Sequence, residues 1–124
     1  MPTFNFVLLY VESPAASAAF YQKLLARPPV ENSPTFAMFI LDNGTKFGLW
    51  SRHTVEPAAT GSAGAGEIAF TVPDAEAVSF VHEAWTELGI AIAQAPVALD
   101  FGFTFVGLDP DGHRLRVFAP GAEA

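Results

Sequence analysis

Residues 109–118 read DPDGHRLRVF, which joins a tight-turn signal to an alternating strand. Pro110 presets the backbone φ angle, and the Asp-Gly pair after it tolerates the left-handed conformation that tight turns need. The pattern therefore predicts a hairpin whose second strand runs from Arg114 to Phe118. Because a hairpin turn determines strand register, it also determines which side chains of that strand share a face.

The strand after this turn places apolar and charged side chains on opposite faces. Side chains alternate along a strand, so Leu115 and Val117 share one face, and Arg114, Arg116 and Phe118 share the other. The first face suits a hydrophobic core. The second face, where arginines stand beside an aromatic ring, is typical of a ligand site.

The composition fits a single domain with a sizeable core. The chain has 124 residues, of which 51% are hydrophobic and 15% charged. Its formal net charge is -7, so we expect no nucleic-acid partner. It has no cysteine, no signal-peptide pattern and no apolar run of the roughly 20 residues that span a bilayer. We therefore expect a cytoplasmic protein with no membrane partner.

The first part of the chain predicts a βαβββ unit. A short apolar run indicates a buried strand, and the Ser-Pro pair after it is a typical helix start. An Asp-Asn-Gly turn between two later apolar runs predicts a hairpin. The expected elements are a strand at 4–11, a helix at 15–25 and strands at 30–33, 35–41 and 46–51.

The same order of elements returns after residues 52–65, which lack periodicity and indicate a linker. A shift of about 61 residues superimposes two expected helix N-caps, Ser13 and Asp74. The second unit is expected to have a strand at 67–72, a helix that Gly89 ends, and strands at 91–97, 102–108 and 114–118. We therefore predict one domain over residues 1–124, built from repeats at about 1–51 and 66–120.

Two such repeats predict an α+β fold with curved mixed sheets, a helix on the outer face of each sheet and a concave ligand cleft on the other. The alternation of side chains between the two faces of each strand, called parity below, assigns a mixed set of aromatic and charged side chains to the concave side. These are Phe4, Phe6, Leu8, Gly48, Trp50, Glu67, Ala69, Arg114, Arg116 and Phe118.

The chain resembles the vicinal oxygen chelate superfamily, which includes glyoxalase I, extradiol dioxygenases and bleomycin-resistance proteins. The likeness lies in Ser17-x-x-Phe20-Tyr21 after the first strand, in the paired units and in the Asp-Pro-Asp-Gly-His motif at 109–113. It covers nearly the whole chain. The superfamily implies a homodimer in which half-sheets of two chains complete two clefts.

Within that superfamily, the chain is similar to small phenazine-antibiotic-resistance proteins, which bind a planar tricyclic drug without altering it. This likeness implies metal-independent sequestration of a planar aromatic molecule, such as an antibiotic. Phe103 departs from the polar residue of that group. The residues that carry the likeness are 47–51, 67–73, 80–86, 100–102, 104–105 and 109–117.

The resemblance also implies where a metal ion would bind in metal-dependent members. Those positions hold Phe6, Gly48, Glu67 and Arg116 here. Only Glu67 could coordinate an ion, whereas such sites need three or more nitrogen or oxygen ligands, and Arg116 would repel a divalent cation. We therefore expect no metal and no cofactor.

The three histidines indicate no further site. His53, His82 and His113 have no spacing typical of metal ligands, so each is assigned to solvent or to local hydrogen bonding. Ser51 lies two residues before His53 with no evident orienting carboxylate. No catalytic triad is expected.

Trp50 is the residue expected to stack on the ligand, because Gly48 before it leaves space for a ring; the alternative is a core or dimer-interface tryptophan. Phe101 and Phe103 are expected to add a second apolar wall, unless they are core residues. The expected ligand-binding residues are Trp50, Phe6, Gly48, Glu67, Phe101, Phe103 and Arg116, and no catalytic residue is assigned.

Three functions remain open from the sequence. The first is a metal-independent binding protein in which Glu67 and Arg116 either pair with each other or contact the ligand. The second is a glyoxalase-like lyase or an extradiol dioxygenase, suggested by the fold alone. The third is a metal-free enzyme with Glu67 as general base. The poor metal-ligand set favours the binding protein over an enzyme.

Overall fold

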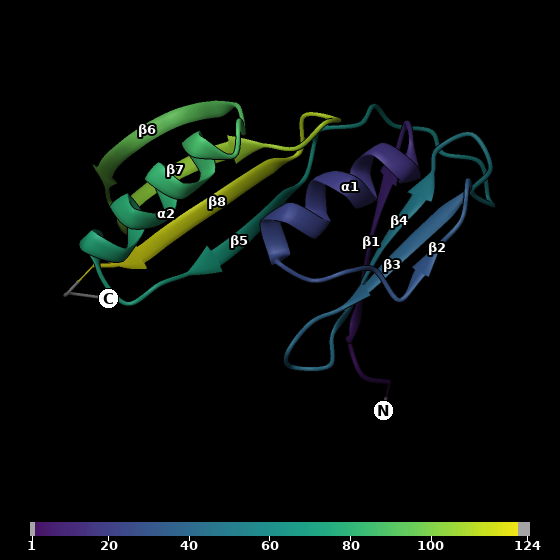
Figure 1. Cartoon of the computed structure of the whole chain (residues 1–124), viewed down its shortest axis with the longest axis horizontal. Coiled ribbons are helices and arrows are strands. Elements are labelled where there is room, and N and C mark those ends of the chain that lie inside the picture. Colours follow the sequence, from purple (N-terminus) through teal and green to yellow (C-terminus); the bar gives the residue numbers. More distant parts are fainter. Residues whose placement is uncertain (1, 122–124) are drawn as a thin grey trace. The chain divides into compact units, whose positions relative to one another are not determined.

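A computed structural model describes residues 2–121 and divides the chain into two compact units, Met1–Ser62 and Ala63–Ala124 (Figure 1). Each unit contains one helix and one four-stranded mixed sheet. Strand, helix and three strands follow one another in both units, so the predicted α+β fold of two βαβββ repeats is confirmed.

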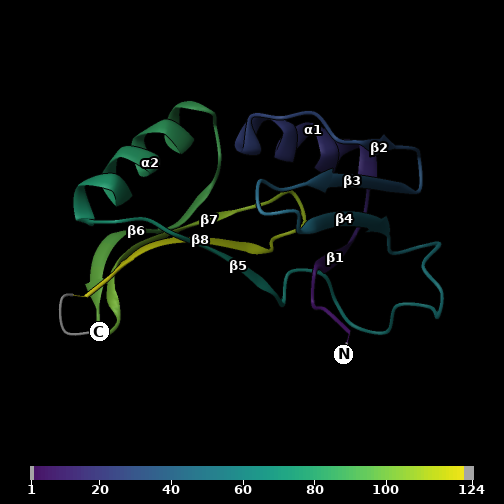
Figure 2. The same ribbon diagram turned by 90° about the horizontal axis from the view of Figure 1, so that it is seen from below.

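The sheet of unit 1 has the strand order β1-β4-β3-β2, in which β1 and β4 are parallel and the other neighbours antiparallel. The helix α1 lies on one face of this sheet (Figure 2). The elements are β1 (Phe6–Val11), α1 (Pro14–Leu25), β2 (Glu31–Asn32), β3 (Phe36–Ile40) and β4 (Lys46–Ser51).

Local signals determine where α1 begins and what it covers. The Ser13 side chain accepts a hydrogen bond from the amide of Ala16 at 3.2 Å, and a proline occupies the first helical position. The buried Tyr21 ring packs edge-on against Phe47 with centroids 4.8 Å apart. Apolar side chains of β3 and β4 on this face, including Phe39, are buried, so the core of unit 1 lies between α1 and the sheet.

Unit 2 repeats the topology, with the strand order β5-β8-β7-β6 and a parallel pair formed by β5 and β8. The helix α2 lies on one face of its sheet (Figure 2). The elements are β5 (Glu67–Thr71), α2 (Ala75–Glu87), β6 (Ile92–Leu99), β7 (Gly102–Leu108) and β8 (Arg114–Pro120).

The core of unit 2 centres on Trp85 of α2. Its indole packs edge-on against Phe105 at 5.2 Å and Phe70 at 5.7 Å between centroids. The predicted N-cap Asp74 accepts a hydrogen bond from the amide of Ala77 at 2.8 Å, and Gly89 follows the helix with a φ of 81°. Both predicted ends of this helix are therefore confirmed.

The turn before β8 is held by one buried carboxylate. Oδ1 of Asp109 accepts hydrogen bonds from the amides of Asp111 and His113, each at 2.9 Å, and Gly112 has a φ of 86°. This turn brings Leu108 of β7 opposite Arg114 of β8. The predicted hairpin and its register are thus confirmed.

Several predicted strand boundaries differ from the observed ones. Residues 4–5 lie outside β1 because its pairing with β4 begins at Phe6, and Phe4 is 88% exposed. The short strand expected at 30–33 is present as β2, Glu31–Asn32, and the flanking amides of Val30 and Ser33 also donate to carbonyls of β3. β6 extends to Leu99 because its last residue still pairs with β7.

Neither helix in residues 2–121 has the length and apolar composition that a membrane crossing needs.

Candidate functional site

The open face of the sheet in unit 1 carries an apolar groove of about 390 Å³. It is lined by Phe6 and Leu8 of β1, Phe36 of β3 and Trp50 of β4. Phe6 and Leu8 are 37% and 39% exposed, although side chains of this kind are usually buried. The parity prediction for these β1 and β4 residues is confirmed, since α1 covers the other face.

Trp50 lies at the centre of an aromatic row. The register places it between Tyr10 of β1 and Phe36 of β3, and the rings of Phe36 and Trp50 meet edge to face with centroids 6.1 Å apart. Trp50 is partly exposed, and its indole N–H donates no hydrogen bond to any residue in the range 2–121. A ring face and a free donor are therefore available to a ligand.

Gly48 does not leave the empty space that the sequence suggested. A Cβ atom at this position would lie 2.6 Å from Cδ2 of Leu8 and 3.1 and 3.2 Å from the rings of Phe6 and Phe36. The expectation of a vacant position beside Trp50 is therefore wrong, because neighbouring side chains lean over the glycine. Gly48 instead lets three apolar side chains meet directly above the sheet backbone.

In unit 2, Arg116 and Glu67 pair with each other on the face opposite to α2. Nε of Arg116 lies 2.8 Å from Oε2 of Glu67, and Nη2 lies 3.3 Å from Oε1. Nη1 also donates to the hydroxyl of Thr104 at 3.3 Å, and that hydroxyl donates to the carbonyl of Val117 at 2.9 Å. This resolves the alternative left open from the sequence in favour of an intramolecular ion pair.

Phe101 and Phe103 do not form one wall. Phe101 lies in the turn before β7, where its ring contacts Phe118 with centroids 5.9 Å apart and lies 5.6 Å from the guanidinium of Arg116. Phe103 shares the parity of Phe105, which packs against α2. The expectation of a shared face is wrong, because a turn residue does not follow the alternation of the strand.

The residues at the superfamily metal positions do not fit a metal ion. Phe6 and Gly48 offer no side-chain donor, and both carboxylate oxygens of Glu67 contact Arg116. Among residues 2–121, no three His, Cys, Asp or Glu side chains cluster as metal ligands would. This donor set would not satisfy a divalent ion.

The three histidines occupy separate environments. His53 pairs with Glu12 at 2.5 Å between Nε2 and Oε2, and both side chains are largely exposed. His113 is buried against Asp109, with Nδ1 3.0 Å from Oδ2. His82 is partly exposed, its ring packs edge-on to Phe105, and its carbonyl accepts a hydrogen bond from the hydroxyl of Thr86 at 2.7 Å. The hydroxyl of Ser51 accepts a hydrogen bond from the backbone amide of His53 at 3.2 Å, and the imidazole of His53 pairs with Glu12 instead of this hydroxyl.

Two βαβββ units, each with one helix-covered and one open sheet face, define the class of paired βαβββ-module proteins. The chain belongs to the glyoxalase/bleomycin resistance protein/dioxygenase superfamily, whose model matches residues 3–117.

Individual relatives support this membership. The chain is 32% identical over 116 residues to the phenazine antibiotic resistance protein EhpR of Enterobacter agglomerans, a match that covers 91% of this chain and 88% of that protein. It is 49% identical to protein ATC0852 of Agrobacterium tumefaciens, whose NMR structure has a TM-score of 0.88 and covers 98% of this chain and 100% of that one. A glyoxalase/bleomycin resistance protein/dioxygenase from Nocardioides shares the fold, with 22% identity, a TM-score of 0.83 and coverage of 100% and 87%.

Proposed function

We propose that this protein binds a planar aromatic small molecule and sequesters it without a metal ion. The observation that carries the proposal is the open apolar groove around Trp50, with its partly exposed indole and free N–H donor. The similarity to a phenazine antibiotic resistance protein supports a flat aromatic antibiotic as the ligand. Binding alone would then lower the free concentration of the compound.

The groove has suitable size and chemistry for such a ligand. Its volume of about 390 Å³ falls within the roughly 300–1,000 Å³ typical of small-molecule sites. Its walls are aromatic and aliphatic, and aromatic rings favour offset or edge-to-face contacts with other rings. A flat heteroaromatic ligand would gain both stacking on Trp50 and a hydrogen bond from the indole.

The chain's two tryptophans, Trp50 and Trp85, make the test direct. Trp85 lies in the core, so a Trp85→Phe protein reports on Trp50 alone. Titration of that protein with phenazine should quench its fluorescence. Trp50→Ala in the wild-type background should weaken phenazine binding, measured by calorimetry, about tenfold or more, and Trp50→Phe should retain most of it. Unchanged fluorescence, or a Trp50→Ala protein that binds as well as wild type, would overturn the proposal.

Enzymatic activity is the second candidate, because the family includes glyoxalases and dioxygenases. Both carboxylate oxygens of Glu67 contact Arg116, which argues against metal coordination by Glu67 and against its role as a general base. Purified protein that contains stoichiometric Ni, Zn, Mn or Fe would favour a lyase or dioxygenase. Substrate turnover that Glu67→Gln abolishes would favour the metal-free enzyme.

Dimer formation and a cytoplasmic location also remain predictions. Exposed Phe6, Leu8 and Tyr10 on one sheet face support a symmetric dimer with two equivalent sites, since apolar surface in water forfeits roughly 25 cal/mol per Å². Sedimentation equilibrium should give twice the mass of one chain, and a monomer at micromolar concentration would contradict this. Cell fractionation tests the location.

A further inference from the structure

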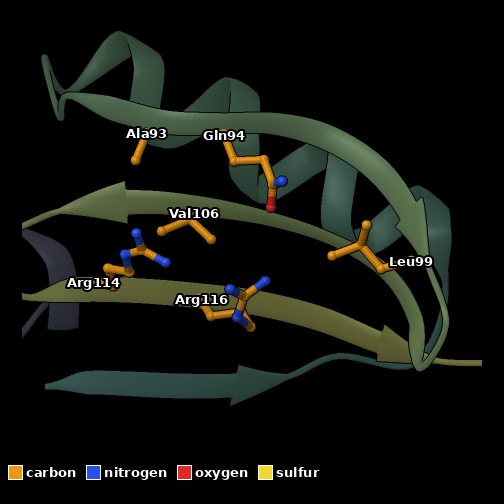
Figure 3. Close-up of a pocket in the computed structure, with 6 residues that line it drawn as sticks. All are labelled: Ala93, Gln94, Leu99, Val106, Arg114 and Arg116. Carbon is orange, nitrogen blue, oxygen red and sulfur yellow. The ribbon is translucent and has the colours of Figure 1, made fainter.

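A second pocket lies within unit 2, on the face of the sheet opposite to α2 (Figure 3). Its volume is about 190 Å³. Two arginines of β8 point into it beside Val106 of β7, and β6 supplies the opposite wall (Figure 3). The lining residues are Ala93, Gln94, Leu99, Val106, Arg114 and Arg116.

The two arginines differ in how their charges are balanced. Arg116 is bonded to Glu67 through two nitrogens and to Thr104 through the third. Arg114 is exposed, and its side chain forms no ion pair or hydrogen bond with the rest of residues 2–121. Glu67 is the direct neighbour of Arg114 in the strand register, yet both of its oxygens contact Arg116. Two cations and one anion leave one positive charge uncompensated.

The other side of the pocket adds a polar group and apolar surface. The β6 strand has irregular register on both sides of Gln94, and such irregularities redirect side chains. The carboxamide of Gln94 points from β6 toward β7 (Figure 3) and has no hydrogen-bond partner within the described part of the chain. Leu99 and Val106 provide apolar contact beside it.

We propose that this pocket selects ligands that carry a carboxylate, which Arg114 binds as the charged donor and Gln94 as a neutral donor. This carboxylate site lies wholly within unit 2, so the inference goes beyond the aromatic groove proposed in unit 1 and does not require one ligand to occupy both. A guanidinium fork matches the two oxygens of a carboxylate, and a monoanion balances the single free positive charge. The apolar wall suits the aromatic ring to which that carboxylate is attached.

The test compares phenazine-1-carboxylate with phenazine-1-carboxamide, which share a ring system and differ in charge. The wild-type protein should bind the acid about tenfold more tightly at low salt, and this preference should shrink as NaCl screens the charges. Arg114→Ala should abolish the preference by weakening only the acid. Lys23→Ala, which removes an exposed charge from α1, should preserve it. Equal affinities of wild type for the two compounds, or an unchanged preference in Arg114→Ala, would overturn the inference.

A second variant predicts the opposite change. Glu67→Gln removes the anion that occupies Arg116, so the pocket would hold two uncompensated cations and bind the acid more tightly than wild type does. If Glu67 itself contacted the ligand, its loss would weaken binding. Weaker binding of the acid by a folded Glu67→Gln protein would therefore contradict the charge assignment.

NMR separates the failure of this inference from that of the proposed function. Benzoate should shift the NMR signals of the side-chain amide of Gln94 and the backbone amide of Arg114. In the Arg114→Ala protein, benzoate should no longer shift the Gln94 signal. If benzoate causes these shifts but phenazine does not quench Trp50, the carboxylate site is supported and the aromatic groove is rejected. If phenazine quenches Trp50 but benzoate causes no shifts, the aromatic groove is supported and the carboxylate site is rejected. Inorganic phosphate that competes as well as benzoate would overturn the assignment to carboxylates.

Discussion

Arg116 and Glu67 connect the last and first strands of unit 2 through two contacts, at 2.8 Å and 3.3 Å. The Arg116 side chain is 16% exposed and that of Glu67 is 37% exposed. Such two-point geometry is stronger than a single charge contact, although water still reaches the carboxylate. The pair therefore holds β8 to β5 and also removes one of the two arginine charges from the neighbouring pocket.

A double-mutant cycle on this pair should reveal a measurable coupling. Arg116→Ala, Glu67→Gln and the double variant should give a coupling of about 1 kcal/mol in the free energy of unfolding, measured in urea. Arg27 and Asp42 provide a control, because Asp42 is 93% exposed in that ion pair. Their coupling should stay below about 0.5 kcal/mol. Equal couplings for the two pairs would contradict the importance of burial.

Replacement of the buried carboxylate in the β7–β8 turn should be costly. Asp109 has a fully buried side chain that accepts from two backbone amides and faces Nδ1 of His113. Asp109→Ala leaves these donors without their acceptor and should lower the free energy of unfolding by about 2–3 kcal/mol. Asp109→Asn, which retains one acceptor oxygen, should cost less. The control is Asp100→Ala, which removes an exposed carboxylate and should change the free energy of unfolding by less than about 0.5 kcal/mol. If Asp100→Ala costs as much as Asp109→Ala, the buried hydrogen bonds of Asp109 do not explain the loss.

Much of the fold was predictable because its signals are local. A serine or aspartate N-cap, an Asp-Pro-Asp-Gly turn and period-two alternation each depend on only a few consecutive residues. The parity of β8 was sufficient to place Arg116 on the open face. The strand expected at 30–33 is shorter in the structure, because its extent depends on pairing with β3, which local propensity does not report.

The details of the site depend on contacts that parity alone does not contain. Parity placed Glu67 and Arg116 on one face, but their pairing requires the parallel neighbours β5 and β8 to be in register. Alternation along β7 does not predict the position of Phe101, because this residue lies in the turn before the strand. The hydrogen bond between Arg116 and Thr104 was not predicted from the sequence. Alternation could have indicated it, because Thr104 shares a face of β7 with Val106, which pairs with Arg116.

Two glycines with positive φ angles should respond differently to alanine. Gly102 has a φ of 143°, and a Cβ there would lie 2.0 Å from the carbonyl oxygen of Ala119. Gly44 has a φ of 86° and open space around it. Gly44→Ala should cost about 1–2 kcal/mol from backbone strain alone. Gly102→Ala adds a clash with backbone and should cost more than about 3 kcal/mol or prevent folding, as thermal unfolding followed by circular dichroism would show. Equal losses would indicate that the close approach is absent.

Gly48→Ala should separate ligand binding from stability. The new methyl group would push Leu8, Phe6 and Phe36 away from the sheet and into the groove beside Trp50. The atoms that must move are the ends of side chains on an open face, so the free energy of unfolding should fall by only about 1 kcal/mol. Phenazine affinity, measured by calorimetry, should fall about tenfold because the groove becomes narrower.

Gly107→Ala is the matched control for that change. Its Cβ would lie 3.1 Å from the indole of Trp85 and 3.2 Å from Ile90, so the strain falls on the tightly packed core of unit 2. This variant should lose about 1–3 kcal/mol of stability and keep its phenazine affinity, because no residue of the groove is displaced. If Gly48→Ala retains full affinity while Gly107→Ala loses it, the ligand does not bind beside Trp50.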